Sequence, residues 1–202
     1  MSAVLALMRY RYMDKGSRII CLLLWIDVAA EVVAFLWAKK FGTNYVVYNI
    51  HFFVEYVLIC MYFNYAFVFL YKRRIGIYLA VAGVALGAVS ICFMPSFTRA
   101  LNMNFLYLQN LVVVGLSLFS MYRFIIIDDY NMHLYRKIHF WLPAIFAFYE
   151  TSTLFLWGAY KCFHEQSIIV CNYLHLVIAV MLYAAFSLVW VFYPRLRFRR
   201  VE

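Results

Sequence analysis

Six long apolar stretches alternate with short polar connections along the chain, at residues 19–37, 45–71, 75–94, 104–127, 140–160 and 168–193. A helix needs about 20 residues to cross the hydrocarbon core of a bilayer, and each stretch is close to or above that length. None shows the alternating pattern of about ten residues that is typical of transmembrane β-strands. The pattern therefore predicts an all-α membrane protein, a bundle of six transmembrane helices over residues 19–193.

The segments outside this bundle are short. Residues 1–8 are apolar and residues 9–18 are basic, so the chain begins like the last two turns of a helix followed by a cytoplasmic segment. We expect this stub either to lie at the membrane interface or to be the remainder of a seventh helix, truncated or missing at the N-terminus. Residues 194–202 form a basic tail, which we expect to contact anionic lipid headgroups.

Composition restricts the class of protein. Hydrophobic residues make up 68% of the chain and charged residues 13%, whereas soluble domains have about half and a quarter. A soluble chain of 202 residues could not bury so much apolar surface in one core. The net charge of +9 would suggest nucleic acid in a soluble protein, but these cations lie in the connections between apolar stretches. We expect the lipid bilayer as the partner, and no nucleic acid.

The cations also predict the orientation of the bundle. Of the 18 Lys and Arg residues, 14 lie in connections on one side: Arg9, Arg11, Lys15, Arg18, Lys72, Arg73, Arg74, Arg123, Arg136, Lys137, Arg195, Arg197, Arg199 and Arg200. Only Lys39, Lys40, Arg99 and Lys161 lie on the other. Short connections rich in Lys and Arg stay in the cytoplasm. The bias predicts a multi-pass protein of the inner (plasma) membrane with a cytoplasmic C-terminus.

Titratable side chains inside the apolar stretches mark the candidate site. Six of them share a band in the outer half of the membrane: Asp27, Glu31, His51, Glu55, Glu150 and His175. Glu31, His51 and His175 lie roughly 9 to 10 Å below the outer ends of their stretches, and the other three roughly 15 Å below. Embedded carboxylates are costly and face the bundle interior. We predict a polar cavity that opens outward; the alternative is that the acids are protonated and only bond neighbouring helices.

Such a band requires positive charge, because no Lys or Arg is embedded beside it. A proton relay, a Na⁺-like site and an amine-bearing ligand each fit, and Gln109, Asn110 and Asn172 are expected to bond neighbouring helices. Zinc on His51, Glu55, His175 and Glu31 or Glu150 would permit metal-dependent hydrolysis of lipid within the membrane. The sequence contains no nucleophile elbow, HExxH, Walker A or dinucleotide motif, so it indicates no enzyme class and no cofactor.

These observations favour ligand binding as the function. We expect a protein that binds a small molecule or cation, for sensing or as an accessory subunit, and that passes its output to a membrane protein partner because its connections are short. A transporter of ions or small molecules, an intramembrane lipid hydrolase and a purely structural subunit are the alternatives.

Two further features concern packing and redox state. Gly76, Ala80, Gly83, Gly87 and Ser90 share one helical face, which we expect to pack inside the bundle rather than form a dimer. Cys162 and Cys171 bracket the last outer connection. On an oxidising side of the membrane they could form a disulfide; otherwise they are free thiols.

Three short motifs carry a family resemblance: NIHFFVEY at residues 49–56, NMNFL at residues 102–106 and FW at residues 140–141. With them, most of the chain resembles a set of uncharacterised bacterial integral membrane proteins of six or seven helices. The resemblance implies a helical bundle with a complete helix ahead of the basic segment, where this chain has only the stub. It implies no activity.

Overall fold

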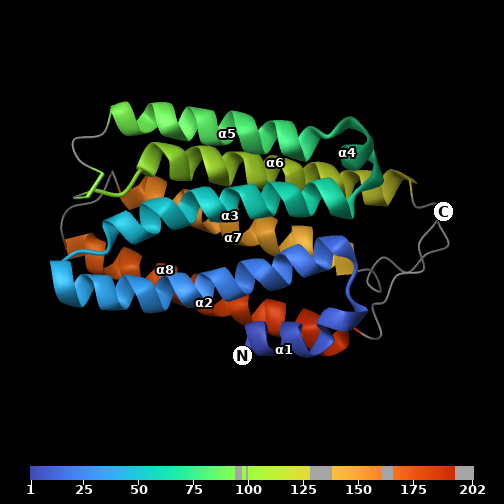
Figure 1. Cartoon of the computed structure of the whole chain (residues 1–202), viewed down its shortest axis with the longest axis horizontal. Helices are drawn as coiled ribbons and strands as arrows, with labels where there is room; N and C mark the ends of the chain where they lie inside the picture. Colours follow the sequence, from blue (N-terminus) through green and yellow to red (C-terminus); the bar gives the residue numbers. More distant parts are fainter. Residues whose placement is uncertain (94–96, 99, 128–137, 161–165, 194–202) are drawn as a thin grey trace. The chain divides into compact units, whose positions relative to one another are not determined.

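The structure is a computed structural model that describes residues 1–93, 97–98, 100–127, 138–160 and 166–193, and these residues form helices and no strands. Five helices are long and apolar enough to cross a membrane: α2 (Lys15–Phe41), α3 (Tyr45–Ala66), α5 (Ile75–Cys92), α6 (Met103–Ile127) and α8 (Gln166–Phe192). They are labelled in Figure 1. The expected all-α class is confirmed, and these five helices are candidate membrane spans.

The sixth predicted span corresponds to α7 (Ile138–Tyr160), which is not among the five helices found long and apolar enough to cross a membrane. Its middle carries Glu150, Thr151, Ser152 and Thr153 in succession, and these lower its mean hydropathy. A crossing by α7 therefore stays a prediction.

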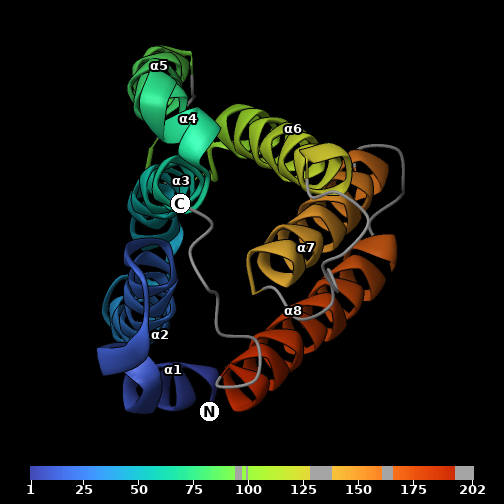
Figure 2. The same cartoon turned by 90° about the vertical axis from the view of Figure 1, so that its right-hand side faces the viewer.

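The chain divides into two compact units. Tyr10–Gln109 contains the 3₁₀ turn Tyr10–Tyr12, α2, α3, α4 (Val68–Arg73), α5 and the first residues of α6; we call it the α2–α5 unit. Met1–Arg9 and Asn110–Glu202 contain α1 (Ser2–Arg9), the rest of α6, α7 and α8, and form the α7–α8 unit. Figure 2 shows α2, α3 and α5 nearly end on.

Local signals set the bounds of α2. Asp14 caps its N-terminus, since its carboxylate accepts hydrogen bonds from the Gly16 backbone N–H at 2.9 Å and the Ser17 hydroxyl at 2.6 Å. Gly42 ends the helix in a left-handed conformation, with φ of 77°. The short connection to Tyr45 makes α3 run antiparallel to α2, and Gly16 near the start of α2 contacts Ala66 at the end of α3.

The second predicted span, residues 45–71, is interrupted at Phe67. This residue is extended, with φ of −119° and ψ of 116°, and separates α3 from the short α4. The 22 residues of α3 already suffice to cross a bilayer, so the helix does not need to continue beyond Ala66. Phe67 and Val68 also have only moderate helix propensity, which makes the break inexpensive.

The small-residue face of α5 packs against α3, as predicted. Gly76, Ala80, Gly83 and Gly87 are all buried. A Cβ on Gly83 would overlap the Tyr56 ring of α3, and a Cβ on Gly87 would lie 2.5 Å from Phe53. Small residues therefore let the two helix backbones approach closely, which is how apolar helices associate without a hydrophobic driving force.

Two residues of the motifs in the resemblance have structural roles in this unit. Asn49 of α3 donates from Nδ2 to the carbonyl oxygens of Phe97 and Ala100, both at 2.9 Å, and its Oδ1 accepts from the Asn102 backbone N–H at 2.8 Å. Asn102 in turn accepts from the Phe105 N–H at 3.1 Å and so caps α6. Together they fix the connection between α5 and α6 to α3.

In the α7–α8 unit, the N-terminal stub is a helix with a defined neighbour. Helix α1 packs against α8, and its Ala3 and Ala6 are buried. Asn110 of α6 donates to the Thr153 hydroxyl of α7 at 3.1 Å, as expected for a residue that bonds neighbouring helices. Helices α7 and α8 also contact each other, for example through the edge-to-face rings of Phe146 and Phe186.

Candidate functional site

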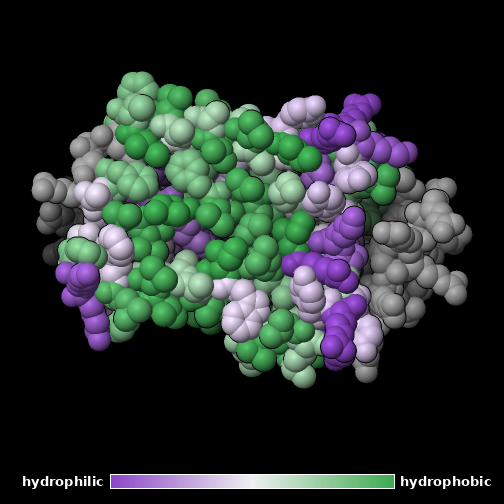
Figure 3. All heavy atoms as spheres, viewed as in Figure 1, coloured by the Kyte–Doolittle hydropathy of each residue, from purple (hydrophilic) through white to green (hydrophobic). Residues whose placement is uncertain are grey.

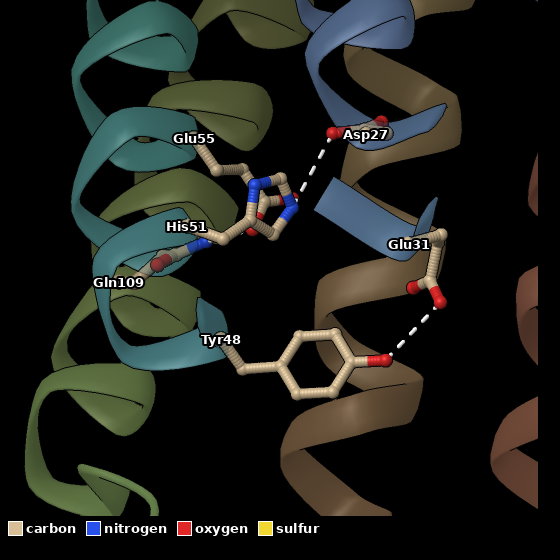
Figure 4. Close-up of polar contacts among 6 residues, drawn as sticks. All are labelled: Asp27, Glu31, Tyr48, His51, Glu55 and Gln109. Carbon is tan, nitrogen blue, oxygen red and sulfur yellow. Dashed lines mark hydrogen bonds and ion pairs between the residues drawn. The ribbon is translucent and has the colours of Figure 1, made fainter. Parts of the chain in front are cut away.

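The candidate site lies in the α2–α5 unit, where polar side chains of α2 and α3 face one another (Figure 4). Asp27 and Glu31 are one turn apart on α2, and Tyr48, His51 and Glu55 share a face of α3. Asp27 and Glu55 lie near the middle of their helices, whereas Tyr48 lies three residues after the start of α3. The structure thus brings together four of the six predicted residues, Asp27, Glu31, His51 and Glu55.

Three polar contacts organise this cluster. The Nε2 of His51 lies 3.4 Å from Oδ1 of Asp27, with only 14% and 13% of the two side chains exposed. The Tyr48 hydroxyl donates to Oε2 of Glu31 at 3.1 Å. The Gln109 amide of α6 donates to Oε2 of Glu55 at 3.0 Å. Each carboxyl of the cluster therefore has one polar neighbour on another helix.

The charges of the cluster are not balanced. Asp27 faces His51, which can carry a positive charge. Glu31 and Glu55 each face a neutral donor, a tyrosine hydroxyl and a glutamine amide. A carboxylate in a membrane is costly unless it is paired. The carboxylates of Glu31 and Glu55 therefore carry negative charge that no neighbouring side chain neutralises. Bound protons or a bound cation would neutralise it.

Several polar atoms around this site have unused hydrogen-bonding capacity. Asp27 Oδ1, His51 Nδ1 and Gln109 Oε1 are buried and make no hydrogen bond to any described residue. Buried polar atoms are normally paired, and an unpaired one points to water, an ion or a ligand. The cluster thus offers two acceptors and one imidazole nitrogen to an additional group.

A metal centre does not fit the described residues. Among residues 1–93, 97–98, 100–127, 138–160 and 166–193, no three His, Cys, Asp or Glu side chains converge closely enough to hold a metal ion. The zinc hypothesis, and with it the lipid hydrolase, requires such a group.

The other two predicted residues belong to the α7–α8 unit. Glu150 is buried on α7, and the ring of His175 on α8 lies 5.6 Å from that of Trp157. Their membership of one cavity with the cluster on α2 and α3 stays a prediction. Asn172 lies in α8, but its side chain is outside the described part.

Sequence reasoning missed the role of Gln109, which we expected only to bond a neighbouring helix. It bonds a neighbouring helix through a carboxyl of the candidate site. Its depth, about six residues below the start of α6, was the available signal. Cys171 is a buried free thiol; because Cys162 lies outside the described residues, the disulfide stays a prediction.

Comparison of the chain with protein-family models, with curated proteins and with solved structures finds no match in any of the three. The resemblance to bacterial proteins of six or seven helices accordingly stays a prediction.

Proposed function

We propose that this protein binds a small, positively charged molecule between α2 and α3, for sensing or as an accessory subunit of a membrane partner. One observation carries the proposal: Glu31 and Glu55 lie in membrane-spanning helices and are each held by a single neutral donor. A ligand cation supplies the charge that these carboxyls lack. Asp27 Oδ1 and His51 Nδ1, which make no hydrogen bond among the described residues, can accept or donate hydrogen bonds beside it.

An organic ammonium group suits this arrangement better than a metal ion. Metals bind where several ligands converge on one point, which the described residues do not provide. An ammonium group can instead bond separate carboxyls through its different N–H groups. The Tyr48 ring lies beside Glu31 and can contribute a cation–π contact. Amines are therefore the ligand class that we propose.

We place this site in a protein of six spans, with α7 as the fifth crossing. The 23 residues of α7 extend about 34 Å, which is sufficient for the hydrocarbon core. The distribution of Lys and Arg supports a cytoplasmic C-terminus and an inner-membrane location. In this orientation the cluster lies toward the outer side of the membrane.

The test is ligand-dependent thermal stability of the purified chain in mild detergent. A panel of primary amines, Na⁺ and pH values is compared on the parent, on Glu31→Gln and on Glu55→Gln. These substitutions keep the size of the side chain and remove its charge. We expect an amine to raise the melting temperature of the parent, and both variants to lose most of that rise.

Two other outcomes would change the proposal. A rise with Na⁺ or with falling pH, and none with amines, would assign the site to inorganic cations or protons. No rise with any additive, together with variants as stable as the parent, would refute ligand binding and leave a structural role. Tyr48→Phe is the matched control, because it removes one hydrogen bond to Glu31 and leaves the charge unchanged.

A further inference from the structure

The end of the α2–α5 unit at which α2 begins is strongly basic. It carries six exposed cations: Arg11, Lys15, Arg18, Lys72, Arg73 and Arg74. The contact of Gly16 with Ala66 places the start of α2 beside the end of α3, from which α4 follows directly. Figure 3 shows hydrophilic side chains gathered at this end, beyond the apolar surface of α2, α3 and α5. We call it the basic end.

Nothing in the unit neutralises this charge. The acidic residue of the segment is Asp14, and its carboxylate is engaged in capping α2. No ion pair joins any of the six cations to a carboxyl group among the described residues. Arg18 lies 5.3 Å from the Tyr10 ring and Arg73 lies 4.8 Å from the Phe69 ring. Aromatic rings beside cations are typical of the membrane–water interface.

The turn between α4 and α5 concentrates the positive potential. Lys72, Arg73 and Arg74 are consecutive, and α5 begins at the next residue with no side chain bonded to its first N–H groups. The N-terminus of a helix itself favours anions. Because α5 is apolar over its 18 residues and long enough to span, a crossing by α5 would place its first turn at the level of the lipid phosphates.

We propose that the basic end binds the phosphate of an anionic phospholipid, with the α4–α5 turn as the principal contact. A lipid fits better than a soluble phosphate because Val68 and Tyr71, on the same short helix, are also exposed. Acyl chains and the glycerol region would cover these side chains, whereas a soluble anion would leave them in water. The proposal is independent of the amine site between α2 and α3.

The experiment measures binding of phosphatidylglycerol and phosphatidylcholine to the purified full chain in neutral detergent micelles. Three proteins are compared: the parent, the triple variant Lys72→Gln, Arg73→Gln, Arg74→Asn, and the control Lys39→Gln, Lys40→Gln. Asn is chosen at position 74 because it tolerates the left-handed conformation that Arg74 adopts, with φ of 52°. The control removes two exposed lysines from the opposite end of α2.

We expect the parent to prefer phosphatidylglycerol and the triple variant to lose most of that preference. Each cation beside an anionic surface contributes roughly fivefold, so three predict a loss of roughly a hundredfold at low ionic strength. The control should retain the preference. If the triple variant does not fold, Lys72→Gln alone provides the same test, with a loss of roughly fivefold.

Three results would overturn the proposal. Equal binding of the two lipids by the parent would show that the basic end has no selectivity for anionic lipid. An equal loss in the control would show that net charge matters and the position of the cations does not. Release of bound phosphatidylglycerol by millimolar inorganic phosphate would show that the contact is made to phosphate alone, without the lipid.

Discussion

Gly83→Ala tests the packing that holds α3, and with it the candidate site, in position. A Cβ at this position would overlap two ring carbons and the hydroxyl oxygen of Tyr56. Tyr56 is 1% exposed and its hydroxyl donates to the Leu79 carbonyl oxygen at 2.8 Å, so the ring has little freedom to withdraw. Tyr56 directly follows Glu55, and a shift of the ring would therefore disturb the cluster.

The expected change in the free energy of unfolding has three contributions. Overpacking a tight contact costs about 1 to 3 kcal/mol. Displacing the Tyr56 hydroxyl from its acceptor adds about 1 kcal/mol. The gain in helix propensity from Gly to Ala offsets about 1 kcal/mol. We expect Gly83→Ala to lower the free energy of unfolding by about 1 to 3 kcal/mol.

The matched control is Gly115→Ala, on α6. A Cβ there meets no atom within 4 Å, so only the propensity gain remains. We expect it to leave the free energy of unfolding unchanged or to raise it by up to about 1 kcal/mol. Unfolding by denaturing detergent, followed by circular dichroism in mixed micelles, measures both variants against the parent.

A double-mutant cycle identifies the cause. In a Tyr56→Leu background the ring is absent, and Gly83→Ala should cost at least about 1 kcal/mol less than it does in the parent. The reasoning would be refuted if Gly83→Ala and Gly115→Ala had equal stability. It would also be refuted if the cycle showed no coupling between positions 56 and 83.

Three further predictions concern local structure and use the same unfolding assay. Asn49→Leu should cost about 3 kcal/mol, because it removes three hydrogen bonds that fix the α5–α6 connection; a cost below that of Tyr48→Phe would contradict this role. Asp14→Ala should cost about 1 kcal/mol through the lost cap of α2. Arg74→Gly should raise stability by up to about 1 kcal/mol, since φ of 52° is unfavourable for Arg, whereas an equal rise with Arg74→Ala would argue against backbone strain.

Much of the fold could be predicted from the sequence because lipid requires continuous helices with few polar side chains. That requirement fixed the helical class and the approximate bounds of five spans. The small residues of α5 predicted a close contact, since Gly has no side chain to keep backbones apart. The break at Phe67 was not predictable, because no Gly or Pro marks it and the apolar stretch continues without interruption.

Membership of the candidate site was easier to predict than its pairing. Helical spacing placed Asp27 with Glu31, and His51 with Glu55, on single faces, and the structure confirms that these faces meet. Depth measured from the ends of the apolar stretches put Asp27 level with Glu55, and Glu31 level with His51, but predicted no contacts between them. In the structure Asp27 contacts His51, and Glu31 contacts Tyr48.

The contacts differ from the depths because α2 extends beyond the start of α3. Asp27 lies 14 residues before Phe41, the last residue of α2, whereas His51 lies six residues after Tyr45, the first of α3. Because these side chains meet, α2 extends about 12 Å beyond the start of α3. Sequence gives the length of each helix but not its offset from a neighbour, which side-chain packing decides. The offset has a chemical consequence, because it gives the imidazole to Asp27 and leaves Glu31 and Glu55 with neutral donors, the two carboxyls on which the proposed amine site depends.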